Sequence, residues 1–260
     1  MTKLERRMID VLQKLRQEVG VIGVKAEFEA EGTRVEELLR LLDVASKAGL
    51  KIALKIGGCE AVRDLIESQS YGCDYIIAPM VETEYALIKF IEASKKIYGV
   101  DRSSVDLLFN IETKTSFENR DELITAAVGD IDGVVFGRVD YVTSCGISRA
   151  DVNSKKVLGH VKQVAELCSA SCLDFVIGGG ISTDSLDFLR DVSDSGLARF
   201  ETRKIIFEAN SLKSSVIEEG LLKAVEFELL WLKNKRQHYE IILNEDKARI
   251  EMLESRWGRF

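Results

Sequence analysis

Short apolar runs and longer amphipathic segments alternate along most of the chain. The runs are rich in Val, Ile, Leu and Phe and are bounded by glycine or polar residues, as buried strands are. The segments between them carry apolar residues three and four positions apart, as Val35, Leu38 and Leu42 do, and this spacing predicts helices with one buried face. The predicted strands span residues 21–29, 50–57, 74–79, 105–112, 131–137, 173–179 and 197–203.

Strands that alternate with helices predict an α/β protein with a parallel sheet. Seven such units favour a TIM-type (β/α)8 barrel over an open dinucleotide-binding sheet, and no GxGxxG motif follows the first strand. Seven strands are clear in the pattern, whereas the eighth is not identified from the sequence.

The last part of the chain has a different pattern. Residues 214–256 contain no proline and one glycine, Gly220, and apolar residues recur among charges of both signs. This predicts a long C-terminal helical extension of one or two helices. We therefore divide the chain into a barrel with an N-terminal helix, residues 1–213, and an extension, residues 214–260. We expect the extension to pack across a subunit boundary in a homo-oligomer, because its apolar positions are too many for a solvated helix.

Composition narrows the class of protein. The net charge is −7 and the sequence pI is about 5.2, so no basic surface for nucleic acid or an anionic membrane is expected. No apolar run approaches the ~20 residues of a membrane helix, and the first 15 residues do not resemble a signal peptide. Five scattered cysteines indicate reduced thiols, so we expect a cytoplasmic protein. Two histidines are too few for a His-rich metal site.

Charged and polar residues gather at the C-terminal ends of the predicted strands. In a barrel these ends converge on one face, where active sites lie. Rim residues can also be polar merely because they meet solvent, but charges inside apolar runs favour a functional cluster. Its members include Lys25, Glu27 and Glu29 on the first strand, Lys55 on the second, Asn110 and Glu112 on the fourth, Arg138 and Asp140 on the fifth, and Glu201 and Arg203 on the seventh.

Glu112 and Asp140 are the best candidate metal ligands. They follow consecutive strands, and neighbouring parallel strands lie about 4.8 Å apart, so both carboxylates can reach one ion. Two carboxylates with waters and substrate oxygens are a usual way to hold Mg²⁺. Two salt-bridged rim acids are the alternative.

Lys55 and the glycine-rich segment 178–183 each leave several possibilities open. A lysine that closes a barrel strand can be a Schiff-base nucleophile, a cation that stabilises an enolate, or a salt-bridge partner. Gly179, Gly180 and Ser182 lie before a predicted helix, where backbone N–H groups can bind an anion or simply form a turn.

Three segments together resemble the HpcH/HpaI aldolase/citrate lyase β-subunit superfamily. They are APMVETEYA (78–86), FNIETKTSFENRDELI (109–124) and GVVFGRVDYVTSCG (133–146), in the order and spacing typical of that superfamily. The resemblance covers roughly residues 20–210. It implies a barrel, Mg²⁺ or Mn²⁺ held by Glu112 and Asp140, carbon–carbon bond cleavage or formation through a pyruvate- or acyl-derived enolate, and homo-oligomers with C-terminal helices packed on neighbours.

The sequence departs from the pyruvate aldolases of this superfamily at two positions. Lys55 stands where they usually have an arginine, and Phe28 stands where they have an acid–base histidine. We expect Glu29, or a water on the metal, to replace that histidine, and Arg203 to supply the missing contact to a carboxylate or phosphate. Arg138 is also atypical of these aldolases. We expect the substrate-binding residues to be Glu27, Arg138, Gly179, Gly180 and Ser182.

The resulting expectation is a divalent-metal-dependent carbon–carbon lyase or aldolase that acts through the enolate of a pyruvate-like 2-oxo acid or a related carboxylic substrate. Lys55, Glu29 and Arg203 would be catalytic. One alternative is a barrel enzyme that binds a phosphosugar or phosphoenolpyruvate through the glycine loop. Another is an oligomeric scaffold that has lost catalysis, which Phe28 favours and the paired acids Glu112 and Asp140 disfavour.

Overall fold

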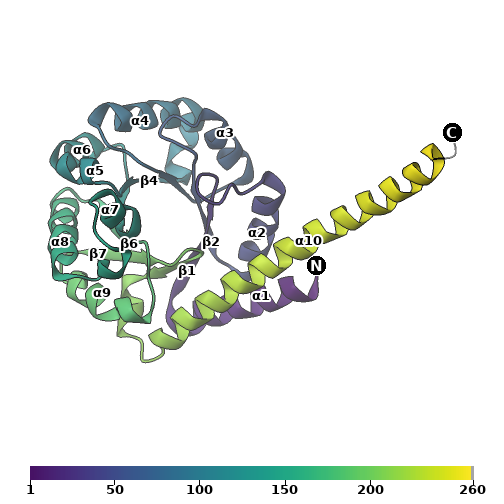
Figure 1. The fold of residues 1–260 in the computed structure, drawn as a ribbon. Helices are drawn as coiled ribbons and strands as arrows, with labels where there is room; N and C mark the ends of the chain where they lie inside the picture. Colours follow the sequence, from purple (N-terminus) through teal and green to yellow (C-terminus); the bar gives the residue numbers. More distant parts are fainter. Residues whose placement is uncertain (259–260) are drawn as a thin grey trace.

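The computed structural model describes residues 1–258 and contains a closed barrel of eight strands (Figure 1). The strands follow one another around the barrel in chain order, and each of the first seven runs parallel to its neighbours among them. The predicted α/β TIM-type barrel is thereby confirmed. The strands are β1 (Val21–Glu27), β2 (Lys51–Lys55), β3 (Tyr75–Ala78), β4 (Asp106–Ile111), β5 (Gly133–Gly137), β6 (Asp174–Gly178), β7 (Leu197–Glu201) and β8 (Ile205–Glu208).

The last strand departs from a regular (β/α)8 barrel. β8 runs antiparallel to both of its neighbours, β7 and β1. It follows β7 through a tight turn, in which the Thr202 N–H donates to the Ile205 carbonyl at 2.9 Å. This strand is the one that the sequence left unidentified. It is short and directly follows β7, so no helix between them marks it as a separate unit.

Helices cover the outside of the barrel (Figure 1). Side-chain caps begin several of them: Thr2, Thr83 and Ser154 accept from backbone N–H groups of the first turn. The helices are α1 (Lys3–Lys14), α2 (Val35–Ala48), α3 (Val62–Tyr71), α4 (Glu84–Tyr98), α5 (Lys114–Glu118), α6 (Arg120–Ala127), α7 (Arg138–Ser144), α8 (Lys155–Ala170), α9 (Leu186–Ser193) and α10 (Ile217–Trp257), with short turns η1 (Leu15–Val19), η2 (Gly99–Ser104), η3 (Arg149–Asp151), η4 (Thr183–Ser185) and η5 (Ala209–Lys213).

The barrel interior is filled by side chains, as is usual for this fold. Tyr75, Ile77, Leu108, Val135 and Val176 are buried there in one apolar cluster. Chemistry is therefore confined to the ends of the barrel.

The predicted C-terminal extension is a single helix, α10, of 41 residues. Its first half packs along α1, and the rest projects past the barrel (Figure 1). Gly220 allows α10 to pack closely on η1, since a Cβ there would lie 2.7 Å from Cγ1 of Val19. The division at residue 213/214 stays a prediction, because the first half of α10 shares the barrel's core. Within residues 1–258, no helix is both long and apolar enough to cross a membrane.

Candidate active site

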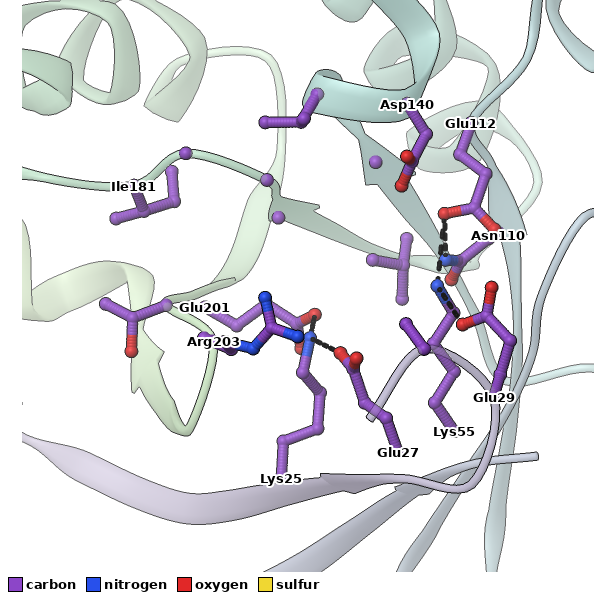
Figure 2. Close-up of a pocket in the computed structure, with 18 of the residues that line it drawn as sticks. Lys25, Glu27, Glu29, Lys55, Asn110, Glu112, Asp140, Ile181, Glu201 and Arg203 are labelled. Atoms are coloured by element: carbon purple, nitrogen blue, oxygen red, sulfur yellow. Dashed lines mark hydrogen bonds and ion pairs between the residues drawn. The ribbon is translucent and has the colours of Figure 1, made fainter. Parts of the chain in front are cut away.

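A cavity of about 570 Å³ opens at the C-terminal mouth of the barrel. That size is in the range of small-molecule sites. Six carboxylates and four cationic side chains line it, so negative charge is in excess. Figure 2 labels Lys25, Glu27, Glu29, Lys55, Asn110, Glu112, Asp140, Ile181, Glu201 and Arg203 in the lining. The lining also includes Arg149, Gly179, Gly180 and Glu228. The predicted convergence of strand ends brings together most of the candidate residues.

Lys55 ends β2 and lies between two carboxylates (Figure 2). Its Nζ is 3.1 Å from Oε2 of Glu29 and 3.3 Å from Oε2 of Glu112. Burial opposes its positive charge, but Glu112 and Glu29 outweigh burial and raise the pKa of Lys55. The amine is therefore protonated at neutral pH. A protonated amine is an electrostatic group rather than a nucleophile.

Glu112 follows β4 directly and is held on both carboxylate oxygens. Oε1 accepts from the Met80 N–H at 2.9 Å, and Oε2 accepts from Nδ2 of Asn110 at 2.7 Å. Met80 has a φ of 51°, an unfavourable conformation for a residue with a side chain, and such strain concentrates at functional sites. Gly137 on the adjacent strand leaves room for this carboxylate, since a Cβ there would lie 2.8 Å from Oε2.

A second set of buried charges lies beside the first. Lys25 on β1 contacts Glu27 at 3.2 Å and forms a short ion pair with Glu201 at the end of β7. Burial disfavours the Lys25 charge, but Glu201 and Glu27 more than compensate, so the pKa of Lys25 is raised. Burial opposes the charge on Glu27 as well, yet Lys25 and Lys55 lower its pKa. Glu27 is therefore ionised at neutral pH. It balances the positive charge of the two lysines and has no proton to donate.

Asp140 lies in the first turn of α7, three residues beyond the end of β5. Its side chain points into the cavity from the same side as Glu112 (Figure 2). Within residues 1–258 it forms neither a hydrogen bond nor an ion pair with another side chain, and it is exposed. Next to Glu112, Oδ1 of Asn110 is buried and has no hydrogen-bond partner among residues 1–258.

These oxygens fit a hard divalent cation. Oε1 of Glu112 accepts one hydrogen bond and keeps a lone pair, and Oδ1 of Asn110 and the Asp140 carboxylate have room for a ligand. No three His, Cys, Asp or Glu side chains of the described residues lie close enough to hold a metal by themselves. Such a site would need waters or substrate oxygens to complete it, as Mg²⁺ sites often do.

Arg203 lies in the β7–β8 turn rather than on a strand. It lines the cavity and bonds Oε1 of Glu31 at 3.1 Å, and its side chain is 53% exposed. The neighbouring Lys204 forms a short ion pair with the other oxygen of Glu31. Glu31 therefore ties the loop after β1 to the β7–β8 turn, and Arg203 lies at the rim of the cavity.

The glycine loop borders the cavity, but two predicted substrate-binding residues do not. Gly179 and Gly180 line it, each with positive φ. Ser182 is absent from the lining and its N–H donates to Oγ of Ser185 at 3.3 Å. Arg138 is fully buried and donates to the carbonyls of Gly178 and Gly179, so it shapes the loop and has no route to substrate, contrary to prediction. Burial lowers the pKa of Arg138 to about 10.

Several site residues had no role assigned from the sequence. The sequence placed Lys25, Asn110 and Glu201 in the polar cluster at the strand ends, because each is a polar residue at the end of an apolar run. Met80 could not be found, because its contribution comes from a backbone N–H in a strained conformation.

A closed α/β barrel with a charged cavity at its C-terminal mouth is the arrangement of a barrel enzyme. The chain belongs to the HpcH/HpaI aldolase/citrate lyase family, whose model matches residues 24–183. The resemblance found in the sequence is thereby confirmed.

Solved structures share the fold at low identity. The HpcH/HpaI aldolase from Desulfitobacterium hafniense DCB-2 is 14% identical, with a TM-score of 0.62 over 84% of this chain and 88% of that chain. An HpcH/HpaI aldolase/citrate lyase family protein from Burkholderia cenocepacia J2315 is 11% identical, with a TM-score of 0.58 over 90% and 98%. Macrophomate synthase is 13% identical, with a TM-score of 0.57 over 90% of each chain.

One curated protein is similar along the sequence. The chromosome partition protein Smc of Rhodopirellula baltica is 25% identical over an alignment of 261 positions, which takes in 94% of this chain. The chain spans about a fifth of that protein's length (20%). An identity this low, to so small a part of a longer protein, assigns no function.

Proposed function

We propose that the protein is a divalent-metal-dependent carbon–carbon lyase that acts through the enolate of a 2-oxo acid. The observation that carries the proposal is the protonated Lys55 between Glu29 and Glu112, in a cavity with surplus carboxylates. An enolate oxygen carries negative charge as it develops, and a fixed, desolvated ammonium stabilises such charge more strongly than water does.

Glu112 and Asp140 would hold Mg²⁺ or Mn²⁺, with Oδ1 of Asn110 close by. The metal would act as a Lewis acid toward the substrate carbonyl. A bound divalent ion would also balance the excess of carboxylates in the lining. Met80, Asn110 and Gly137 would fix the orientation of the Glu112 carboxylate before the ion binds.

The cations around the cavity divide between binding and catalysis. Lys55 would stabilise the enolate oxygen. Arg203 lies at the rim of the cavity and contacts Glu31 through Nε. The two terminal nitrogens of its guanidinium group would bind a substrate carboxylate. Lys25 forms ion pairs with Glu27 and Glu201, so it would neutralise part of their negative charge in the cavity.

Proton transfer would fall to Glu29. Phe28 cannot move protons and packs partly against the core, whereas Glu29 lines the cavity and contacts Lys55. Glu27 is the weaker candidate because two lysines keep it ionised.

Asp140→Asn should weaken Mg²⁺ or Mn²⁺ binding by at least about tenfold, since it removes a hard anionic ligand. Titration calorimetry of the full chain measures this directly. Asp194→Asn is a matched control, because Asp194 is exposed at the far end of α9. Equal affinity of the wild type and Asp140→Asn would show that Asp140 is not a ligand.

A phosphorylated substrate is the second candidate. Gly179, Gly180 and Ile181 line the same cavity, where backbone groups could meet a phosphate. Competition by inorganic phosphate at millimolar concentration would favour this reading over a simple 2-oxo acid.

A further inference from the structure

The outward face of α10 carries an apolar stripe along almost the whole helix. Its positions alternate three and four residues apart from Leu222 to Trp257, the a/d spacing of a heptad repeat. Nine of these eleven positions are apolar or aromatic, and the two exceptions are Arg236 and Asp246. The full set is Leu222, Val225, Leu229, Leu232, Arg236, Tyr239, Leu243, Asp246, Ile250, Leu253 and Trp257.

This stripe is not the face that packs on the barrel. Gly220, Ala224, Phe227 and Trp231 are buried on that face. Most of the stripe stays in solvent even where α10 lies on the barrel, and Leu229 is 50% exposed. Tyr239 is the exception: it is half-buried, and its OH donates to Oε1 of Glu37 at 2.6 Å. Farther on, the helix projects alone (Figure 1), and Trp257 is 84% exposed. An exposed apolar surface of this extent marks an interaction site.

The two charged exceptions are placed symmetrically. Arg236 lies five residues before Ile241, and Asp246 lies five residues after it. Between them the helix surface has a hollow lined by Arg236, Tyr239, Glu240, Ile242, Leu243 and Asp246. Among residues 1–258, Arg236 pairs only with Glu240 on its own helix, at 3.3 Å, and an exposed pair of this kind contributes little stability.

We propose that α10 forms an antiparallel two-stranded coiled coil with α10 of a second copy of this chain, about a twofold axis at Ile241. Across a twofold axis, residue i contacts residue j and j contacts i. Positions equally far from Ile241 are then opposite each other. Arg236 meets Asp246 of the partner subunit, and the remaining pairs are apolar: Tyr239 with Leu243, Leu232 with Ile250, Leu229 with Leu253, and Val225 with Trp257.

Charge selects this arrangement from the others that the stripe allows. A parallel, in-register pair would bury Arg236 against its own copy and Asp246 against its own copy. An antiparallel pair shifted by one heptad would place each charge opposite an apolar side chain, which is costly. Only the register about Ile241 matches both charges with opposite partners, and it does so twice in each dimer. Single polar positions in heptad cores are known to fix register in this way.

The pairing also reaches the candidate active site. Val225 and Glu228 line the rim of the cavity, and Val225 is the position that faces Trp257 of the partner subunit. The end of one α10 therefore lies at the cavity rim of the other copy. The inference does not depend on the chemistry proposed above.

Charge reversal tests the register in the full chain by sedimentation velocity at micromolar concentration. The wild type should sediment at a multiple of 29.1 kDa. Arg236→Asp and Asp246→Arg should each weaken self-association by at least about tenfold, because each creates two like-charge contacts. The double variant R236D/D246R should restore it. Glu251→Arg, which is off the stripe, is the matched control and should have no effect.

Three results would overturn the proposal. The first is a wild type that stays at 29.1 kDa, which leaves the stripe without a second copy. The second is an oligomer whose mass the single reversals do not change. The third is a double variant that stays as weak as the single ones, because an arrangement without the Arg236–Asp246 contact gains nothing from the exchange. Far-UV circular dichroism confirms that each variant keeps its helix.

Discussion

Replacing Lys55 by methionine should lower kcat by roughly 10²–10³, the usual scale for the loss of one group that stabilises developing negative charge. Methionine keeps the length of the side chain and removes the ammonium that lies 3.1 Å from Glu29 and 3.3 Å from Glu112. Steady-state kinetics with a cleavable 2-oxo acid in the presence of Mg²⁺ measures the change. Lys51→Met is the matched control, because Lys51 begins the same strand at the opposite end of the barrel.

The same lysine distinguishes two kinds of lyase chemistry. Because Glu112 and Glu29 outweigh burial and raise the pKa of Lys55, borohydride with pyruvate should leave no covalent adduct on it. A stable adduct found by mass spectrometry would assign Schiff-base chemistry and overturn the proposed role. An unchanged kcat in Lys55→Met would remove Lys55 from the mechanism altogether.

Lys25→Met should lower the free energy of unfolding by about 3–5 kcal/mol, the range for removing one partner of a buried ion pair. Lys25 is buried between Glu27 and Glu201, and both carboxylates would lose this ion-pair partner. Such a loss is a large part of a typical stability of about 5–15 kcal/mol. Urea unfolding followed by circular dichroism gives the value.

An exposed pair supplies the control for this variant. Lys47 pairs with Asp43 on the surface of α2, so Lys47→Met should cost about 0–1 kcal/mol. A loss of less than about 1 kcal/mol in Lys25→Met would mean that Glu27 and Glu201 find other partners or take up protons.

The barrel could be predicted from the sequence because each of the first six strands is an apolar run followed by a helix. β8 could not, since it is four residues long and returns directly from β7 through the turn that contains Arg203. The strand-end rule fails here too. The sequence pattern predicts that Arg203 lies at the end of a strand. In the structure Arg203 lies in the β7–β8 turn, at the rim of the cavity, where it contacts Glu31.

The candidate site could be predicted where side chains alone create it. Lys55 ends β2 and Glu112 follows β4, with β3 between them, and the two side chains meet because the strand ends converge at one mouth of the barrel. Arg138 shows the limit of that rule. It directly follows β5 and its position predicts a substrate contact, but its side chain turns away to bond carbonyls of the glycine loop. Backbone acceptors of that kind leave no trace in the sequence.

Proton exchange of pyruvate tests the central claim most directly, because it reports enolate formation without requiring the second substrate. In D₂O with Mg²⁺ or Mn²⁺, the wild type should catalyse loss of the pyruvate methyl proton signal in NMR. The exchange should stop on chelation and should fall strongly in Lys55→Met and Asp140→Asn. No exchange above the buffer rate with either metal, or exchange that survives both chelation and Asp140→Asn, would contradict a metal-dependent enolate site at this end of the barrel.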